Sequence, residues 1–182
     1  MKVEALAIED VRLISPRVFG DARGFFFESF HAARYTDAGI VGPFVQDNIS
    51  RSERGVLRGL HLQHPKGQGK LVQVLEGAVY DVAVDVRTSS PTFGKWVGAR
   101  LDAETHQQLW VPPGFAHGFL VLSDFALFAY KCTDVYAPEH ELSVRWNDPA
   151  IGIEWPTDTA PKLSEKDRAA PTLAAAKARL PR

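Results

Sequence analysis

Residues 56–77, VLRGLHLQHPKGQGKLVQVLEG, place an arginine, two histidines and two lysines within two short apolar runs. The runs at 57–63 and 70–75 predict two strands, because the segment HPKGQG between them is rich in turn-forming residues. Titratable side chains are costly to bury, so strands that carry several of them usually line a pocket. A second stretch, WVPPGFAHGF at 110–119, adds His117 after a Pro-Pro-Gly turn. Together these stretches predict a β-sheet protein with a site on its strands.

The rest of the chain repeats this pattern of short strands and breakers. Residues 78–87, AVYDVAVDVR, alternate clearly, with Val82, Val84 and Val86 on one face and Asp81 on the other. Many short strands with Gly and Pro turns and little helix indicate an antiparallel sandwich or barrel. One or two strands are expected within 3–14, and the other expected strands are 24–30, 44–49, 95–101, 107–111, 118–122 and 125–136. The expected helices are 31–38 and 172–180, and 16–24 is expected to be a loop.

Length and composition suit one domain of 182 residues, with an N-terminal arm at about 1–30 and a loop and helix region at about 147–182. The formal net charge of −1 provides no global field for nucleic acid or an anionic membrane, so we expect neither as a partner. The first residues lack the pattern of a signal peptide, and no apolar run is long enough to cross a bilayer. The lone Cys132 is expected to be a buried thiol. We therefore expect a soluble, cytoplasmic protein.

His61 is the residue around which a site is expected to form. Taken alone it fits a structural histidine as well as a catalyst, but Arg58 precedes it by three residues and Lys70 opens the next strand. His117 and Tyr130 lie in later strands that would close on the same pocket. Arg58 and His61 should face opposite sides of an ideal strand. A kink at the intervening glycine would bring both to one side.

The spacing of glycine and histidine resembles the two motifs of the cupin β-barrels: Gly59-x-His61, then Glu76-Gly77, then Pro112-x-Gly114-x-x-His117. Metal-binding cupins carry His-x-His in the first motif, whereas Gln63 stands here at the second histidine. His61, His64 and His117 alone supply fewer ligands than the usual site needs. We therefore expect no metal.

Eight segments, in order, resemble the dTDP-4-dehydrorhamnose 3,5-epimerase family over about residues 17–171. They are RGFFFESF, QDNISRS, VLRGLHLQ, GKLVQVLEGAVYDVAVDVR, SSPTFGKW, WVPPGFAHGF, NDPAIGIEWP and LSEKD. The resemblance implies an all-β, cupin-like jelly-roll antiparallel barrel with a few short helices. It also implies a homodimer in which an N-terminal segment reaches into the partner's site. The implied reaction inverts C3 and C5 of a dTDP-linked 4-keto-6-deoxyhexose through an enolate, without a cofactor, in dTDP-L-rhamnose biosynthesis.

The resemblance also implies roles in proton transfer. His61 matches the base, and Asp167 matches the carboxylate that orients this histidine and stabilises its protonated form. Lys70 matches the group that faces the keto oxygen, and Tyr130 matches the acid on the far face of the sugar. Without the resemblance, Asp167 fits a solvated charge, Lys70 an exposed strand-edge lysine and Tyr130 a structural tyrosine.

The remaining implied positions bind the substrate. Arg23 and Arg58 match phosphate contacts, since an arginine fork suits two phosphate oxygens. Tyr136 matches the aromatic ring that stacks on thymine. The other positions matched to the substrate are Phe26, Glu28, Gln46, Asp47, Asn48, Glu141 and Lys166, with His117 as pocket wall and Asp81 behind it. Asp81 points away from the valine face of its strand. If that side faces the pocket, the carboxylate can brace a histidine; if it faces outward, Asp81 lies in solvent.

Three alternatives stay open at this point. A related epimerase acting only at C3 or only at C5 would share the base and the acid. A metal-dependent cupin oxygenase would bind iron. A non-catalytic sugar-nucleotide binding module would bind dTDP without exchanging protons with solvent.

Overall fold

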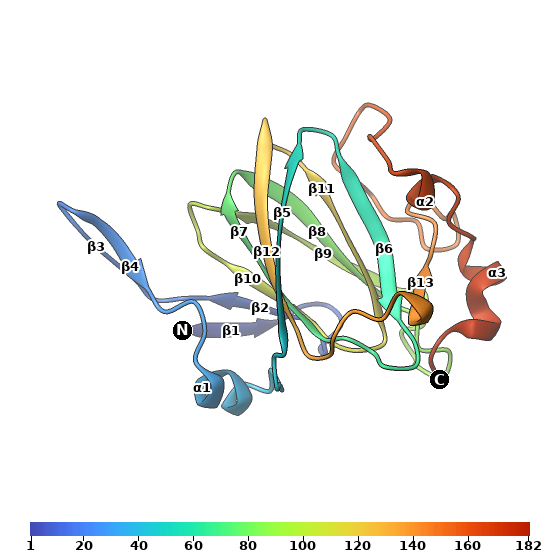
Figure 1. Cartoon of the computed structure of the whole chain (residues 1–182), viewed down its shortest axis with the longest axis horizontal. Coiled ribbons are helices and arrows are strands. Elements are labelled where there is room, and N and C mark those ends of the chain that lie inside the picture. Colours follow the sequence, from blue (N-terminus) through green and yellow to red (C-terminus); the bar gives the residue numbers. More distant parts are fainter.

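The computed structural model describes all 182 residues, and two antiparallel sheets that face one another dominate it (Figure 1). The first sheet has six strands in the order β1-β2-β10-β7-β12-β5. Their bounds are β1 Lys2–Ala5, β2 Arg12–Ser15, β10 Gln108–Val111, β7 Lys70–Glu76, β12 Phe125–Cys132 and β5 Gln46–Glu53. The predicted all-β, jelly-roll class is confirmed.

The second sheet has five strands in the order β13-β6-β11-β8-β9. Their bounds are β13 Glu141–Ser143, β6 Leu57–Gln63, β11 Phe115–Val121, β8 Ala78–Asp85 and β9 Trp96–Asp102. The two strands predicted from residues 56–77 thus lie in different sheets, β6 in the second and β7 in the first. The connecting turn carries the chain from one wall of the barrel to the other, so a site built from both strands lies between the sheets.

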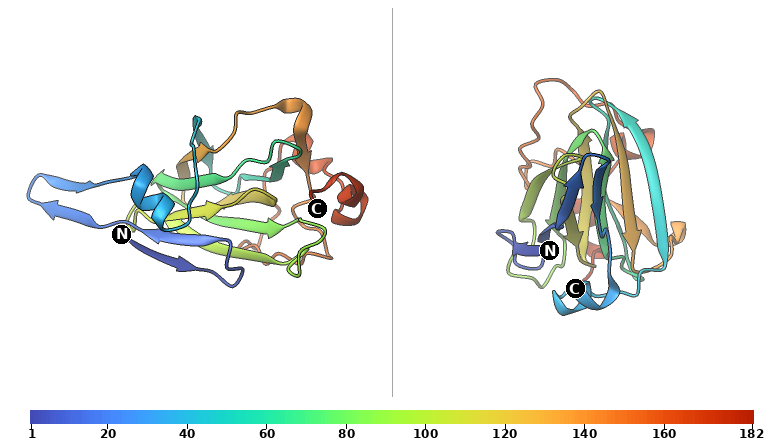
Figure 2. Two further views of the ribbon diagram at one scale, coloured as in Figure 1. Left: turned by 90° about the horizontal axis from the view of Figure 1, so that it is seen from below. Right: turned by 90° about the vertical axis from the view of Figure 1, so that its left-hand side faces the viewer.

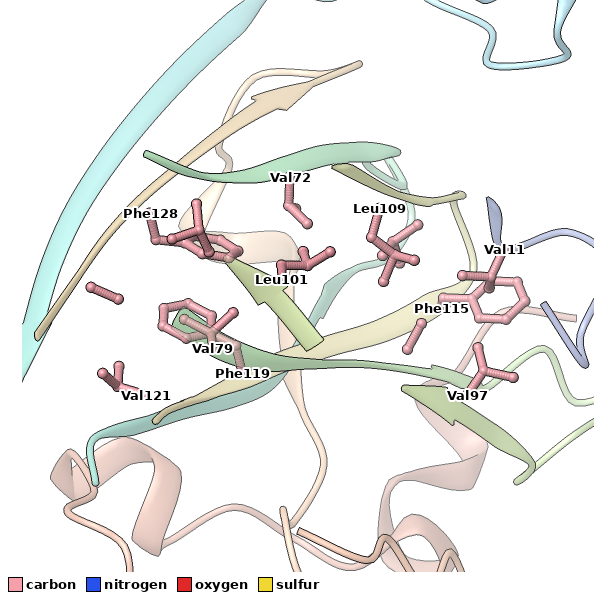
Figure 3. Close-up of a cluster of buried hydrophobic side chains, with 14 of the residues drawn as sticks. Val11, Val72, Val79, Val97, Leu101, Leu109, Phe115, Phe119, Val121 and Phe128 are labelled. Atoms are coloured by element: carbon pink, nitrogen blue, oxygen red, sulfur yellow. The ribbon is translucent and has the colours of Figure 1, made fainter. Parts of the chain in front are cut away.

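The largest cluster of buried apolar side chains lies between the sheets and includes Val72, Val79, Leu109, Phe119 and Phe128 (Figure 3). These residues come from alternate positions of their strands, as the period of two requires. Burial of apolar area on this scale is the dominant stabilising term for such a barrel. The apolar cluster fills part of the interior, and polar side chains occupy the remainder.

Two further apolar clusters cover the outer faces of the sheets. Val82, Val84 and Val86 pack against the C-terminal region, which includes α2 Glu165–Arg168, α3 Leu173–Ala176 and the 3-10 helix η2 Lys177–Arg179. On the other sheet, Tyr35 of α1 Ala32–Asp37 packs over Trp110. The valine face of β8 therefore points outward, and Asp81 points into the barrel. None of the helices is both long and apolar enough to span a membrane.

A two-stranded hairpin, β3 Val18–Asp21 and β4 Gly24–Phe27, projects away from the barrel (Figure 2). The prediction of a loop at 16–24 was therefore wrong, because the sequence VFGD carries turn residues inside what is a strand. Lys2–Ala5 and Arg12–Ser15 form β1 and β2 of the six-stranded sheet, as expected from the alternation in 3–14, so this part of the N-terminal region belongs to the barrel. The projecting part is limited to the hairpin and its connections.

Other boundaries differ modestly from the predictions. The helix expected at 172–180 is split into α3 and η2, while the short strand β13, the 3-10 helix η1 Pro138–His140 and α2 were missed. The α2 helix begins with Ser164, whose Oγ accepts a hydrogen bond from the backbone N–H of Asp167. Ser-x-x-Asp is a capping pattern, so the sequence did carry a signal for this helix. Cys132 is buried as predicted.

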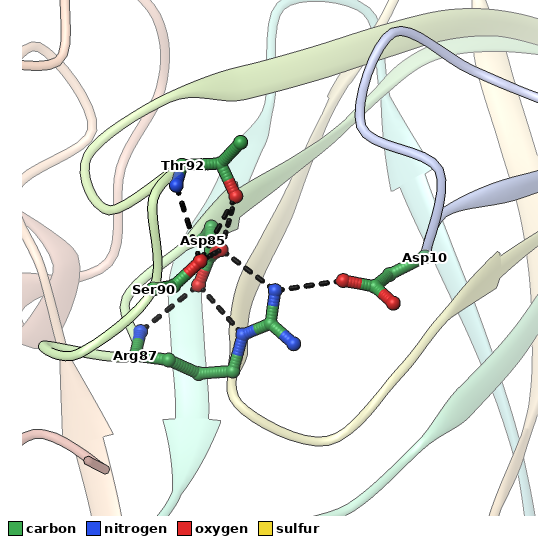
Figure 4. Close-up of polar contacts among 5 residues, drawn as sticks. All are labelled: Asp10, Asp85, Arg87, Ser90 and Thr92. Atoms are coloured by element: carbon green, nitrogen blue, oxygen red, sulfur yellow. Dashed lines mark hydrogen bonds and ion pairs between the residues drawn. The ribbon is translucent and has the colours of Figure 1, made fainter.

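One buried ion pair fixes the turn after β8, at the end of the barrel (Figure 4). The Asp85 carboxylate is fully buried and accepts hydrogen bonds from Arg87, Ser90 and Thr92. Arg87 also contacts Asp10 across the sheet edge. Burial opposes ionisation of Asp85, but these hydrogen bonds outweigh it and lower its pKa to about 2.

Candidate active site

A cleft of about 510 Å³ opens between the two sheets and the C-terminal segment that precedes α2. His61 and His117 of the five-stranded sheet line it, together with Lys70 and Tyr130 of the six-stranded sheet and Asp167 of α2. A smaller hollow of about 240 Å³ adjoins it and shares His61, Lys70 and Tyr130. The three residues therefore stand where the two spaces meet.

A β-bulge in β6 lets Arg58 and His61 line the same cleft. His61 pairs with His117, and Arg58 pairs with Phe119, so three steps along β6 match two along β11. The extra residue in β6 therefore puts the Arg58 and His61 side chains on the same face, which an ideal strand would not allow. Gly59 lies in the bulge at φ +127°, and a Cβ there would be 2.6 Å from the Cα of Gly118. The predicted kink at this glycine is confirmed.

Asp167 and His61 form a directly bonded pair. The Nε2 atom of His61 lies 2.5 Å from Oδ1 of Asp167, whose side chain is almost completely buried. Burial opposes ionisation of this carboxyl, but hydrogen bonds from His61, Ser164 and the Gly59 backbone lower the pKa of Asp167. The carboxylate is therefore ionised and fixes the orientation of the imidazole ring. Its position rules out the solvated terminal charge considered from the sequence.

A second histidine–aspartate pair stands beside the first. The Nε2 atom of His117 lies 2.9 Å and 3.0 Å from the two carboxylate oxygens of Asp81, which is 0% exposed. Burial raises the pKa of Asp81, while His117 and Lys70 oppose that rise. The same burial lowers the pKa of Lys70, and the charges of Cys132, Glu141 and Asp81 partly offset the effect. Asp81 thus braces a cleft histidine from the barrel interior.

Tyr130 lies on β12, opposite the β6 wall that carries His61. Burial raises the pKa of Tyr130, so its phenol stays protonated over the neutral range. No three His, Cys, Asp or Glu side chains gather in the cleft or elsewhere in the arrangement of a metal site. The chemistry that these side chains can perform is proton transfer between facing walls.

Side chains suited to a nucleotide line the smaller hollow. Gln46 and Asn48 come from β5, and the exposed ring of Tyr136 donates its hydroxyl to Glu141 at 2.9 Å. Lys166 pairs with the same carboxylate at 2.5 Å. Burial opposes ionisation of Glu141, but these contacts lower its pKa. A flat aromatic surface, hydrogen-bonding amides and a cation are thus gathered beside the cleft.

Four of the predicted binding residues lie outside the cleft of their own chain. Arg23 and Phe26 are on the projecting hairpin, with the Arg23 side chain 90% exposed and bonded to Asp21. Glu28, just after the hairpin, pairs with Arg34 at 3.0 Å. Asp47 points to the outer face of β5, where it contacts Lys131. Within one chain the structure does not bring these four to the other site residues.

The cleft also contains residues that no motif in the sequence indicated. They are Ser50, Val56, Leu57, Phe119, Phe128, Lys162, Leu163 and Ser164. Ser52, next to this set, accepts a hydrogen bond from Nε of Arg58 at 3.0 Å. A signal for the serines did exist, because QDNISRS alternates polar residues at every second position, as one face of a strand requires.

The sequence pattern of the family described as dTDP-4-dehydrorhamnose 3,5-epimerase matches residues 5–175. The chain belongs to this family. It is therefore a sugar-nucleotide epimerase, an isomerase. The relative of that name from Pseudomonas aeruginosa is 61% identical over 169 residues, which cover 92% of this chain and 93% of the relative.

A solved structure and a further relative are also similar to this epimerase. The Legionella pneumophila enzyme, in complex with dTDP-4-keto-L-rhamnose, is 54% identical and superposes with a TM-score of 0.97, covering 100% of this chain and 97% of that one. A dTDP-4-dehydrorhamnose 3-epimerase from Streptomyces niveus is also similar, at 41% identity over 179 residues, with 97% of this chain and 86% of the relative covered. The family's pathway is dTDP-L-rhamnose biosynthesis.

Proposed function

We propose that this epimerase converts dTDP-4-dehydro-6-deoxy-D-glucose to dTDP-4-dehydro-L-rhamnose by proton transfer between His61 and Tyr130. The observation that carries the proposal is that the Asp167-bonded imidazole and a protonated phenol line one cleft from facing sheets. Inversion of a carbon needs a base on one face of the sugar and an acid on the other. The facing walls supply both.

The tautomer of His61 follows from its bond to Asp167. In the neutral imidazole the proton on Nε2 is donated to the Asp167 carboxylate, so the lone pair that accepts a substrate proton is on Nδ1. When Nδ1 takes the proton from C5 or C3, the ring becomes a cation next to a buried carboxylate. Asp167 stabilises that cation and needs no proton itself.

Lys70 completes the step, because removal of a proton beside the C4 ketone sends the C–H electron pair to the ketone oxygen as an enolate. The Lys70 ammonium faces this developing charge, and its lowered pKa makes donation of a hydrogen bond or proton easier. Tyr130 then delivers its hydroxyl proton to the carbon from the opposite face. Proton exchange with solvent returns His61 to neutral and the tyrosinate to phenol before the second carbon reacts.

The dTDP moiety would occupy the smaller hollow and its border. Tyr136 offers its ring to thymine, Gln46 and Asn48 offer amides, and Arg58 and Lys166 offer cations to the diphosphate. His117, held by Asp81, forms the wall behind the sugar. The two adjoining spaces together therefore offer groups suited to the thymine, the diphosphate and the hexose of a dTDP-sugar.

A homodimer would bring in the binding residues that one chain leaves outside its cleft. The hairpin exposes Phe19, Phe25 and Phe26, and the outer face of β5 and β7 exposes Ile49 and Leu75. Exposed apolar groups gathered on a projection and on a sheet face are typical of surfaces that a partner covers. In this arrangement the hairpin supplies Arg23, Phe26 and Glu28 to the partner's cleft. A cytoplasmic location stays a prediction from the sequence.

The test is incubation with dTDP-4-dehydro-6-deoxy-D-glucose in D₂O, with deuterium followed carbon by carbon. The wild type should incorporate deuterium at C3 and C5 and form the L-rhamno product. His61→Ala should lose exchange at both carbons while retaining dTDP binding, and His64→Ala, which alters the next histidine in the turn, is the matched control. Exchange that persists in His61→Ala would overturn the assignment of the base.

Inversion at C3 alone is the second candidate function, and the similarity to the Streptomyces niveus 3-epimerase favours it. The same experiment separates the two, because a 3-epimerase would leave C5 without inversion. A D-configured product with label at C3 only would establish the second candidate.

A further inference from the structure

Three aromatic rings join the projecting hairpin to the barrel of its own chain. The ring of His106, in the turn between β9 and β10, lies 4.5 Å from the ring of Phe25 and 4.6 Å from that of Phe27, measured between centroids. The two phenyl rings are 6.0 Å apart. Rings at these separations attract one another beyond the effect of the area that they bury. His106 therefore holds β4 at the base of the hairpin.

The contact uses only one face of β4. Successive residues of a strand point to opposite faces, so Phe25 and Phe27 face His106 while Phe26 faces away from it. Phe26 and Glu28, at alternate positions, line a separate hollow that His106 does not border. The run of three phenylalanines thus divides into two rings that anchor the hairpin and one ring that the hairpin presents outward.

Buried amides fix both His106 and the segment that leaves the hairpin. Nε2 of Gln73 donates a hydrogen bond to the backbone oxygen of His106 at 3.3 Å. Nε2 of Gln108 donates to the side-chain oxygen of Gln73 at 3.2 Å and to the backbone oxygen of Ser29 at 2.7 Å. The residue that holds the hairpin and the end of the hairpin are therefore bonded to one pair of amides on the six-stranded sheet.

The backbone of His106 adopts φ +54°, in the left-handed region that residues other than glycine seldom occupy. Glycine or asparagine would satisfy such a turn at lower cost. A residue held in this region persists where the surrounding structure over-determines it, often at a functional site. The His106 side chain is also only 9% exposed, although it belongs to a turn. The turn alone does not account for the ring.

We propose that His106 is a positioning residue for the partner subunit's site, because its ring sets the direction of the hairpin. The proposal rests on the proposed homodimer, in which the hairpin supplies Arg23, Phe26 and Glu28 to the partner's cleft. The groups that transfer protons belong to the chain that forms the cleft. A displaced hairpin should therefore weaken substrate binding and leave the chemical step unchanged.

His106→Asn removes the ring and keeps a side chain that tolerates a positive φ. The variant should remain a dimer in sedimentation velocity and raise KM for dTDP-4-dehydro-6-deoxy-D-glucose about 10-fold, with kcat within a factor of two of wild type. Glu104→Gln is the matched control, since Glu104 is exposed in the same turn and should leave KM and kcat unchanged. An unchanged KM in His106→Asn, or loss of the dimer, would overturn the proposal.

Phe25→Leu is a second variant, and its side chain is too exposed for folding to depend on it. Alone it should raise KM about 3-fold, because one of the two ring contacts is lost. Combined with His106→Asn it should raise KM no further, since the rings act as a unit. Effects that multiply would mean that Phe25 acts without His106, and would overturn the proposal.

A mixture of two variants tests whether His106 acts across the dimer. With an excess of His61→Ala, nearly every His106→Asn chain is in a mixed dimer, where its cleft receives a hairpin with an intact His106. The KM of the mixture should return to the wild-type value. A KM that stays raised after confirmed subunit exchange would overturn the proposal. His61→Ala alone tests the proposed reaction and the mass of the wild type tests the dimer, so failure of either is distinct.

Discussion

His61 and Asp167 are 106 positions apart in the chain, yet Nε2 of one lies 2.5 Å from Oδ1 of the other. The contact is possible because the chain returns to β6 after completing both sheets, and the short helix α2 presents its third residue to the cleft. A capped helix fixes the carboxylate more rigidly than a free terminal loop would. The imidazole that we propose as the base is thus oriented by a segment outside the two sheets of the barrel.

Asp167→Asn should lower kcat by about 10²–10⁴-fold with little change in KM, because the amide cannot stabilise an imidazolium as the carboxylate does. Steady-state kinetics with the natural substrate provide the measurement. Asp158→Asn is the matched control, since Asp158 is exposed in the loop before α2. A kcat within a factor of two of wild type would remove Asp167 from the mechanism.

Tyr130→Phe should retain deuterium incorporation and lose inversion, since His61 still removes the proton but no acid stands on the opposite face. Product stereochemistry and isotope content are measured on the same sample by NMR. Tyr80→Phe is the control, because Tyr80 lies on the outer face of β8 against Trp155. Normal inversion in Tyr130→Phe would place the acid elsewhere.

Asp81→Asn should move the alkaline limb of the kcat/KM profile to lower pH. In the proposed mechanism Lys70 acts as an ammonium, so activity should fall as pH rises through its pKa. Burial already lowers the pKa of Lys70, and the negative charge of Asp81 partly offsets that decrease. Removing the charge lowers it further. An unshifted limb would show that another group sets the alkaline profile, and Lys70→Gln, which lacks the titrating ammonium, is the companion variant.

Ile49→Asp should give a monomer with at least about 10-fold lower kcat/KM, because a charge on the exposed face of β5 opposes burial against a partner. Sedimentation velocity measures the oligomeric state. Ala175→Asp on the exposed side of α3 is the control. A fully active monomer would contradict the proposed contribution of the hairpin to a second site.

Mixing two inactive variants tests the same arrangement independently. His61→Ala lacks the base, and Arg23→Ala lacks the hairpin cation. Exchange of subunits should restore about one quarter of wild-type activity, because half of the dimers are mixed and each has one complete site. No recovery after confirmed subunit exchange would mean that Arg23 serves its own chain.

Asp85→Asn should lower the free energy of unfolding at pH 7 by about 2 kcal/mol, as expected for a carboxyl with an unfolded-state pKa near 4 and a folded pKa of about 2. A lowered folded pKa means that this contribution is present above about pH 4 and disappears as pH falls through about 2. Urea titrations at several pH values measure it. The lowered pKa of Asp85 would be contradicted if the difference in free energy of unfolding between wild type and Asp85→Asn stayed the same from pH 5 to pH 2.

The sequence predicted the barrel well because its evidence is local. Alternation in 78–87 gave β8 and the direction of its valines, and the glycine at position 59 indicated the bulge that reconciles Arg58 with His61. Breakers between apolar runs placed most strand ends within a few residues. These signals depend on the period of a strand and on glycine geometry, which a single chain displays.

The relations between distant segments were not predictable in this way. The burial of Asp81 depends on which face of β8 meets the other sheet, and the contact of Asp167 depends on where the chain returns. The family resemblance, not the spacing of residues, pointed to Asp167. His106 was missed because a histidine in a turn is ordinary until the structure shows which rings lie beside it.

Gly59 and Gly118 face each other across β6 and β11 so closely that a methyl group on either would collide with the backbone of the other strand. The two positions therefore constrain each other, and neither tolerates a substitution even if the other stays glycine. A library aimed at reshaping substrate preference can vary the exposed Arg58 only while this glycine pair is held fixed. Deleting the extra residue of the bulge would match two steps of β6 to two of β11, so Arg58 and His61 would still share a face, with a shorter spacing between them.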